Sequence, residues 1–196
     1  MREGAASLPS WINLPNALTA LRLALVPFVL EALAGGRYVL ALALFGVAAV
    51  SDAADGAIAR RCGATTRVGA YLDPIADKCL LSGIFLALAW RGAAPWWLVG
   101  AIFGRDLYIL LGAAVALRWT RMRQFPPSAW GKFSTFVQIV TAVSLMARGA
   151  FGGPLCGWFA GAMPWPCAAI TAFSGVHYTW RTLRSRGWID ATPTRE

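Results

Sequence analysis

The stretch that decides both fold and chemistry is Ser51–Lys78, which reads SDAADGAIARRCGATTRVGAYLDPIADK. It carries four of the nine acidic residues of the chain, Asp52, Asp55, Asp73 and Asp77, in mainly apolar surroundings. Residues spaced i, i+3 or i, i+4 share one face of an α-helix. We therefore expect Asp52 and Asp55 to lie together on one helix, and Asp73 and Asp77 to lie together on the next.

A polar, glycine-containing segment, 61–68, separates the two pairs and is expected to reverse the chain, so that both pairs point into one cavity. Repulsion and desolvation oppose four negative charges in a low-dielectric site unless cations are bound there. Oxygen ligands suit Mg²⁺ or Mn²⁺, which usually need phosphate oxygens to complete their shells. Two such ions, bound by all four aspartates, would clamp a diphosphate for an in-line displacement at phosphorus.

A simpler interpretation makes these aspartates helix-end charges paired with Arg60, Arg61 and Lys78. That interpretation fits two aspartates at one helix end. It does not fit four with matched spacing on successive helices. We therefore favour the metal site.

The chain as a whole has the composition of a membrane protein. Of its 196 residues, 58% are hydrophobic and 14% are charged, whereas soluble domains carry about 25% charged residues. Apolar runs near the length of ~20 residues needed to cross a bilayer recur along the whole chain. We expect an all-α, polytopic membrane fold with six spans, near Ala17–Ala34, Tyr38–Ala59, Gly69–Trp90, Pro95–Trp119, Phe133–Ala150 and Trp158–Trp180, the last interrupted by Pro164 and Pro166.

Basic residues predict the orientation of these spans. Twelve of them precede the first span, follow the last or lie in one set of connections, and three (Arg37, Arg91 and Arg148) lie in the opposite set. Because Lys and Arg concentrate in cytoplasmic loops, both termini and the aspartate pairs should be cytoplasmic. The net charge is +9, and the arginines that produce it are scattered singly at the ends of apolar runs. This distribution fits contact with anionic lipid head groups better than binding of nucleic acid.

We expect one domain, 1–196, with residues 1–16 as a lead-in to the first span. Trp11, Ile12 and Leu14 alternate there with polar residues, as in a short interfacial helix. For residues 1–9, a disordered tail is an equal alternative.

The aspartate window resembles the CDP-alcohol phosphatidyltransferase family. It fits the family pattern D-x2-D-G-x2-A-R-x8-G-x3-D-x3-D without a departure, and the lead-in Asn13–Arg22 (NLPNALTALR) and the six spans are also similar. The matching residues are Asp52, Asp55, Gly56, Ala59, Arg60, Gly69, Asp73 and Asp77.

The resemblance implies a six-helix membrane fold around a polar cavity open to the cytoplasm, usually as a homodimer, in a bacterial inner membrane. It implies transfer of a phosphatidyl group from CDP-diacylglycerol to an acceptor hydroxyl, with release of CMP. Asp52, Asp55 and Asp73 would hold metal and the CDP diphosphate, and Asp77 would both bind metal and deprotonate the acceptor. The remaining implied CDP contacts are Gly56, Arg60, Thr66 and Gly69, although helix packing alone would explain Gly69.

Arg105, Asp106 and Lys132 are the predicted acceptor-binding residues. Arg105 and Asp106 lie within the fourth span, where ionisable residues are usually functional, and Lys132 opens the fifth span. A self-paired structural couple is the alternative for Arg105 and Asp106. At the positions of Arg105 and Asp106, the family's bacterial phosphatidylglycerophosphate synthases have Arg-Glu. They have a second arginine eight residues after the first, where this chain has Ala113. CDP-diacylglycerol-dependent cardiolipin synthases read R-D. The resemblance therefore favours phosphatidylglycerol as acceptor, with glycerol 3-phosphate as the alternative.

Two other classes of function fit the sequence less well. Aspartate-rich membrane prenyltransferases use similar metal-diphosphate chemistry but are longer, with a different aspartate spacing. A small transporter or ion channel, in which the acids form a cation path, is a remote alternative. It is disfavoured because the acids crowd one half of the chain and no repeat is visible.

Overall fold

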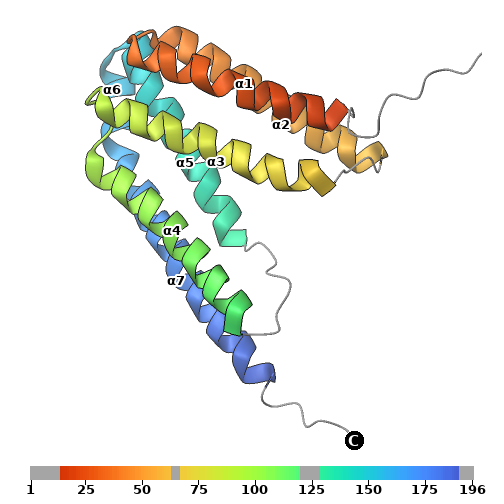
Figure 1. Cartoon of the computed structure of the whole chain (residues 1–196). Helices are drawn as coiled ribbons and strands as arrows, with labels where there is room; N and C mark the ends of the chain where they lie inside the picture. Colours follow the sequence, from red (N-terminus) through yellow and green to blue (C-terminus); the bar gives the residue numbers. More distant parts are fainter. Residues whose placement is uncertain (1–13, 63–66, 120–128, 190–196) are drawn as a thin grey trace, which may run out of the picture. The chain divides into compact units, whose positions relative to one another are not determined.

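The structure, a computed structural model, describes the backbone of residues 14–62, 67–119 and 129–189, and within them the side chains of residues 20–51, 77–112 and 129–180. These described residues form helices and no strands, which confirms the all-α class (Figure 1). The helices are α1 Leu14–Ala34, α2 Tyr38–Cys62, α3 Arg67–Trp90, α4 Trp96–Trp119, α5 Ala129–Phe151, α6 Pro154–Ala162 and α7 Pro164–Ile189.

The first five helices match the predicted segments to within a few residues. The sixth predicted segment is interrupted at Pro164, as expected, but the interruption separates two helices. The segment comprises the nine-residue α6 and the long α7, in place of one interrupted span. Each of them begins with a proline. Proline has no N–H to donate and fits the first helical turn, where no partner is needed, so Pro164 starts a new helix instead of kinking an existing one.

The chain divides into two compact units, Met1–Arg91 and Gly92–Glu196. In the first unit, α1 packs against both α2 and α3, and the three helices lie side by side (Figure 1). The buried positions recur every three or four residues, so one stripe of each helix is covered. These residues are Val29, Ala32 and Leu33 of α1, Ala41, Phe45 and Ala48 of α2, and Leu80, Ile84, Phe85 and Leu88 of α3.

A tight turn joins α1 to α2. Gly36 has φ 71°, a left-handed conformation that favours glycine. Its N–H donates to Leu33 O at 2.9 Å, and the N–H of Arg37 donates to Ala32 O at 2.8 Å. These two bonds form a Schellman motif, which ends α1 and sends the chain back as α2.

Helices α1 and α3 approach closely at Gly83. A Cβ built at this position would lie 3.1 Å from Leu30 Cδ2 and 3.3 Å from Leu30 Cδ1. Small residues at helix contacts let two backbones come together. The absence of a side chain at position 83 therefore helps to set the spacing of α3 against α1.

We predict that Gly83→Leu destabilises the first unit by about 1–3 kcal/mol, the usual cost of overpacking a well-filled contact. Gly46 of α2, where an added Cβ would meet nothing within 4 Å, offers a matched control. Thermal unfolding in detergent should show a lower Tm for Gly83→Leu than for Gly46→Leu. Equal Tm values would show that the α1–α3 spacing does not depend on this glycine.

In the second unit, α4 runs beside α7, and α5 packs against α6 and α7 (Figure 1). Helix α4 buries the apolar residues Leu98 and Ile102 in its first half. The contact between α5 and α7 is polar in part. Buried polar and thiol side chains there are Ser134, Gln138 and Thr141 of α5 and Cys167 and Thr171 of α7.

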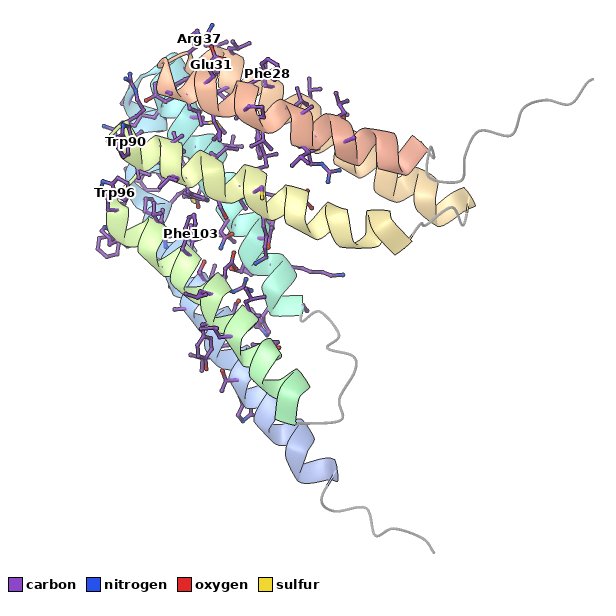
Figure 2. The ribbon with its side chains drawn as sticks, viewed as in Figure 1. Phe28, Glu31, Arg37, Trp90, Trp96 and Phe103 are labelled. Carbon is purple, nitrogen blue, oxygen red and sulfur yellow. The ribbon has the colours of Figure 1, made fainter. Side chains whose placement is uncertain are left out.

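Large apolar side chains cover much of the exterior of both units. Phe28 of α1 and Trp96 and Phe103 of α4 project from their helices and are exposed (Figure 2). Across the described ranges, α5 is the one helix that is long and apolar enough to cross a membrane, with a mean hydropathy of 1.2, and α2 contributes the shorter apolar stretch Tyr38–Ser51. The six-span topology therefore stays a prediction.

Candidate active site

Helices α2 and α3 carry the predicted aspartate pairs. Each helix runs without interruption through its pair, so that Asp52 and Asp55 share α2, while Asp73 and Asp77 share α3. The side chain of Asp77 is described. The predicted site residues Asp52, Asp55, Gly56, Arg60, Gly69 and Asp73 lie outside the described side chains, and Thr66 lies outside the described backbone.

The helical register relates these positions to the buried stripes. Asp52 and Asp55 follow Ala48, a buried residue of α2, by four and seven residues. On α3, Asp77 precedes the buried Leu80 by three residues, and Asp73 lies one turn earlier. By helical spacing, each pair of positions thus extends the stripe by which its own helix packs within the unit.

Asp77 is held by an arginine from the first helix. Arg22 Nη1 of α1 donates to Asp77 Oδ1 at 2.8 Å. The two partners differ in exposure, because the Arg22 side chain is 2% exposed and the Asp77 side chain is 49% exposed. The guanidinium is thus enclosed within the unit, whereas the carboxylate reaches its surface.

Glu31 has a different partner. It pairs with Arg37, whose Nη2 lies 3.2 Å from Glu31 Oε1. Both side chains are largely exposed and lie at the α1–α2 turn (Figure 2). Such a surface pair contributes little to stability.

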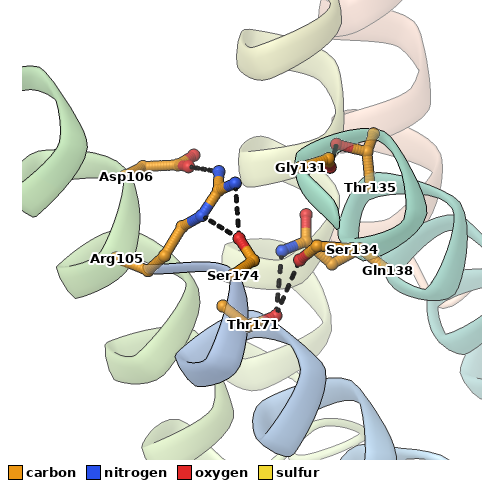
Figure 3. Close-up of polar contacts among 8 residues, drawn as sticks. All are labelled: Arg105, Asp106, Gly131, Ser134, Thr135, Gln138, Thr171 and Ser174. Atoms are coloured by element: carbon orange, nitrogen blue, oxygen red, sulfur yellow. Dashed lines mark hydrogen bonds and ion pairs between the residues drawn. The ribbon is translucent and has the colours of Figure 1, made fainter. Parts of the chain in front are cut away.

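In the second unit, the structure brings two of the predicted acceptor-binding residues together. Arg105 Nη1 donates to Asp106 Oδ1 at 2.7 Å, so the self-paired couple that the sequence allowed is present. Arg105 also donates from Nε and Nη2 to Ser174 Oγ of α7, at 3.0 and 2.7 Å (Figure 3). Side-chain exposures of 14% for Arg105 and 24% for Asp106 leave part of each accessible.

A second set of polar contacts lies one turn away along α7. Thr171 Oγ1 accepts a bond of 3.2 Å from Gln138 Nε2 and lies 3.3 Å from Ser134 Oγ (Figure 3). Thr171 and Ser174 are spaced i, i+3, so one face of α7 contacts Arg105 of α4 and the polar residues of α5. Sequence reasoning missed this face. The polar spacing Thr171, Ser174 within an apolar helix was the available signal.

Lys132 and His177 also belong to the second unit. Lys132, the third predicted acceptor-binding residue, lies in the first turn of α5 with an exposed side chain. His177, the one histidine of the chain, lies among the rings of Trp130, Phe173 and Trp180. Those ring contacts agree with a packing role for His177.

The donor set fits Mg²⁺ or Mn²⁺. Where side chains are described, no three His, Cys, Asp or Glu residues gather into a group that could hold a metal ion, but three of the four predicted ligands lie outside those ranges. All four are carboxylates, which suit hard divalent ions. The half-exposed carboxylate of Asp77 is accessible to such an ion or to a substrate.

Comparison with known proteins relates this chain to lipid-synthesising enzymes. A relative from Mycobacterium tuberculosis, named "Probable phosphatidylglycerophosphate synthase", is 40% identical over 190 residues, covering 92% of this chain and 86% of its own length. A Bacillus subtilis protein, named "CDP-diacylglycerol--glycerol-3-phosphate 3-phosphatidyltransferase", is 30% identical over 191 residues, covering 88% and 98%. A Drosophila melanogaster protein, named "Probable cardiolipin synthase (CMP-forming)", is 30% identical over 172 residues, covering 85% and 52%.

The family model described as CDP-alcohol phosphatidyltransferase matches residues 12–173. This match spans the helices that carry the four aspartates and most of the second unit. The relatives that cover this chain almost completely have names from the same chemistry. The chain therefore belongs to the CDP-alcohol phosphatidyltransferase family, whose members are transferases of phospholipid synthesis.

Proposed function

We propose that this enzyme transfers the phosphatidyl group of CDP-diacylglycerol to a glycerol hydroxyl of phosphatidylglycerol, which releases CMP and forms cardiolipin. The observation that carries the proposal is the placement of Asp77. Its carboxylate is half exposed, fixed by a buried arginine, and lies one helical turn from the position of Asp73 on α3.

The four aspartates have two proposed roles, metal binding and base catalysis. Asp52, Asp55, Asp73 and Asp77 are the proposed ligands of two divalent ions, and the unbroken helices α2 and α3 support a shared helix face for each pair. When bound, Mg²⁺ or Mn²⁺ supplies positive charge that offsets the diphosphate and the leaving group. The proposed CDP contacts Gly56, Arg60, Thr66 and Gly69 hold the nucleotide beside the carboxylates.

Asp77 is the proposed general base. Its carboxylate takes the proton of the acceptor hydroxyl while the acceptor oxygen bonds to the phosphorus of the phosphatidyl group. The bond between that phosphorus and the bridging oxygen of the diphosphate breaks, and CMP leaves with the electron pair. Base catalysis of this kind contributes roughly 10²–10⁴-fold.

The acceptor assignment rests on Arg105. Asp106 already offsets the charge of this arginine at 2.7 Å, and Ala113 stands where a second cation would bind a phosphate monoester. One partly compensated guanidinium suits the single charge of a phosphodiester. Together with Asp106 and Lys132, Arg105 is the proposed acceptor site.

Glycerol 3-phosphate is the second candidate acceptor. The name of the B. subtilis relative contains glycerol 3-phosphate, and the name of the M. tuberculosis relative contains phosphatidylglycerophosphate, the product formed from it. This chain covers 98% and 86% of their lengths, respectively.

One assay separates the acceptors. The purified chain in detergent, supplied with CDP-diacylglycerol and Mg²⁺, is offered phosphatidylglycerol, glycerol 3-phosphate, inositol, inositol phosphate and serine in parallel, and the lipid product is identified by mass. We expect cardiolipin. Phosphatidylglycerophosphate would move the assignment to the second candidate, and a product from inositol or serine would overturn both.

Ser174 provides a test of the proposed acceptor site. Ser174→Ala removes the acceptor of two Arg105 donors, and hydrogen bonds to charged groups contribute about 1.5–3 kcal/mol. We predict a rise of about tenfold or more in the KM for the acceptor, since about 1.4 kcal/mol corresponds to tenfold, with an unchanged KM for CDP-diacylglycerol. Ser144→Ala is the matched control, because the Ser144 hydroxyl donates to backbone oxygens of its own helix. An unchanged acceptor KM in Ser174→Ala would contradict the assignment of Arg105.

The proposed setting is the cytoplasmic face of a bacterial inner membrane. The exposed apolar exterior of both units supports contact with lipid, and the asymmetry of basic residues supports cytoplasmic termini. Six spans, a single domain over residues 1–196 and a homodimer complete the proposal.

A further inference from the structure

We propose that Arg22 is a positioning residue for this reaction, one that fixes the carboxylate of Asp77 against the first helix in the orientation needed for proton transfer. The inference rests on the proposed function of Asp77. It assigns a role in that reaction to α1, a helix that carries none of the four aspartates.

The first argument is the cost of burying an arginine. Removing a guanidinium from water carries a desolvation penalty that ion pairing often fails to offset, so an apolar residue would usually stabilise the contact as well or better. Arg22 is nevertheless 2% exposed and lies on the stripe that continues into Val29 and Leu33. Packing of α1 against its neighbours therefore gives no reason for an arginine at this position.

The second argument is the unequal exposure of the pair. The enclosed guanidinium has little freedom to move, while the carboxylate it contacts at 2.8 Å is 49% exposed. A fixed donor on Oδ1 restricts rotation of the Asp77 carboxylate. The exposed part of that group is then held in one direction, as proton transfer to a positioned base requires.

The third argument is the rigid contact that follows along the same two helices. Leu30 lies eight residues after Arg22 on α1, and Gly83 lies six residues after Asp77 on α3. The two helices meet at these positions, where a Cβ built at Gly83 would lie 3.1 Å from Leu30 Cδ2. This close approach fixes the register of α1 against α3. The ion pair is therefore set by the packing of the helices and not by side-chain flexibility.

The test compares Arg22→Gln, Arg22→Lys and wild type in detergent, with kcat and the KM for CDP-diacylglycerol measured separately. Binding of CDP-diacylglycerol with Mn²⁺ and the Tm are measured as readouts apart from turnover. We expect Arg22→Gln to lower kcat by about 10²-fold, the loss typical of a group displaced by about 1 Å, with KM and binding unchanged. Arg22→Lys, which keeps the charge but not the planar fork, should recover part of kcat.

Two comparisons sharpen the result. Arg37→Gln breaks the exposed Arg37–Glu31 pair of the same unit and should leave kcat at the wild-type value. Adding Arg22→Gln to Asp77→Asn should cause no further loss of residual turnover, because residues that act through one another are non-additive.

Each contrary outcome has a distinct meaning. Full kcat in a folded Arg22→Gln variant, alongside an inactive Asp77→Asn variant, would overturn this inference and leave the proposed function standing. Loss of CDP-diacylglycerol binding and Tm in both Arg22 variants, or failure of both to fold, would also overturn it, since Arg22 would then be structural. Absence of turnover in the wild-type enzyme would overturn the proposed function and this inference together.

Discussion

Asp77→Asn is expected to reduce turnover by roughly 10²–10⁴-fold, the contribution of a positioned general base. Asparagine keeps the shape of the side chain and can still accept a hydrogen bond from Arg22, but it cannot take a proton from the acceptor hydroxyl. The affinity for CDP-diacylglycerol should be largely retained, because Asp52, Asp55 and Asp73, the residues proposed to hold the CDP diphosphate through metal, are intact. Measurement of kcat by CMP release, with binding of CDP-diacylglycerol measured separately, checks both parts.

Controls for this variant come from the same unit. Glu31→Gln neutralises an exposed carboxylate that also pairs with an arginine, and it should leave turnover unchanged. Because loss of one partner of a buried pair can destabilise a protein, the Tm of Asp77→Asn must be compared with that of wild type. Full turnover in a folded Asp77→Asn variant would remove Asp77 from the role of base.

Asp52→Asn and Asp55→Asn are expected to give a loss of a different kind. Each removes a proposed metal ligand, so both turnover and the binding of CDP-diacylglycerol should fall. Metal ions supply several kcal/mol of charge stabilisation in the transition state, and about 4 kcal/mol corresponds to about a thousandfold in rate. Turnover should therefore fall by about three orders of magnitude or more in each variant.

The contrast with Asp77→Asn is the decisive feature of this second prediction. Binding of CDP-diacylglycerol, followed in the presence of Mn²⁺, should be lost in the α2 variants and retained in the α3 variant. If Asp52→Asn and Asp55→Asn bind the CDP-lipid as wild type does, these aspartates do not hold its diphosphate through metal. The null result would favour helix-end charges on α2.

The fold was largely predictable because its signals are local. Apolar runs and glycine breakers gave five helices to within a few residues, and Gly36 ends α1 as a breaker should. The interruption at Pro164 was predicted, but its outcome, two separate helices α6 and α7, was not. A proline in an apolar run either kinks a helix or starts a new one, and spacing alone does not distinguish the two.

The candidate site was predictable where its residues are close in sequence. The aspartate positions follow from helical spacing within Ser51–Lys78, and Arg105–Asp106 are neighbours. The partners Arg22 and Ser174 were not found, since they lie 55 and 69 residues away from Asp77 and Arg105. Contacts of this range depend on which helix faces pack together, and a single sequence does not contain that information.

The most direct test of the central claim is the stoichiometry and metal dependence of CMP release. The purified enzyme in detergent receives CDP-diacylglycerol and phosphatidylglycerol, first after chelation with EDTA and then with Mg²⁺ or Mn²⁺ restored, and CMP and lipid product are quantified together. The account predicts one CMP for each phosphatidyl group transferred, no transfer after chelation, and recovery with either ion. Transfer that continues undiminished after chelation, or no CMP release with restored metal and any of the five acceptors, would contradict it.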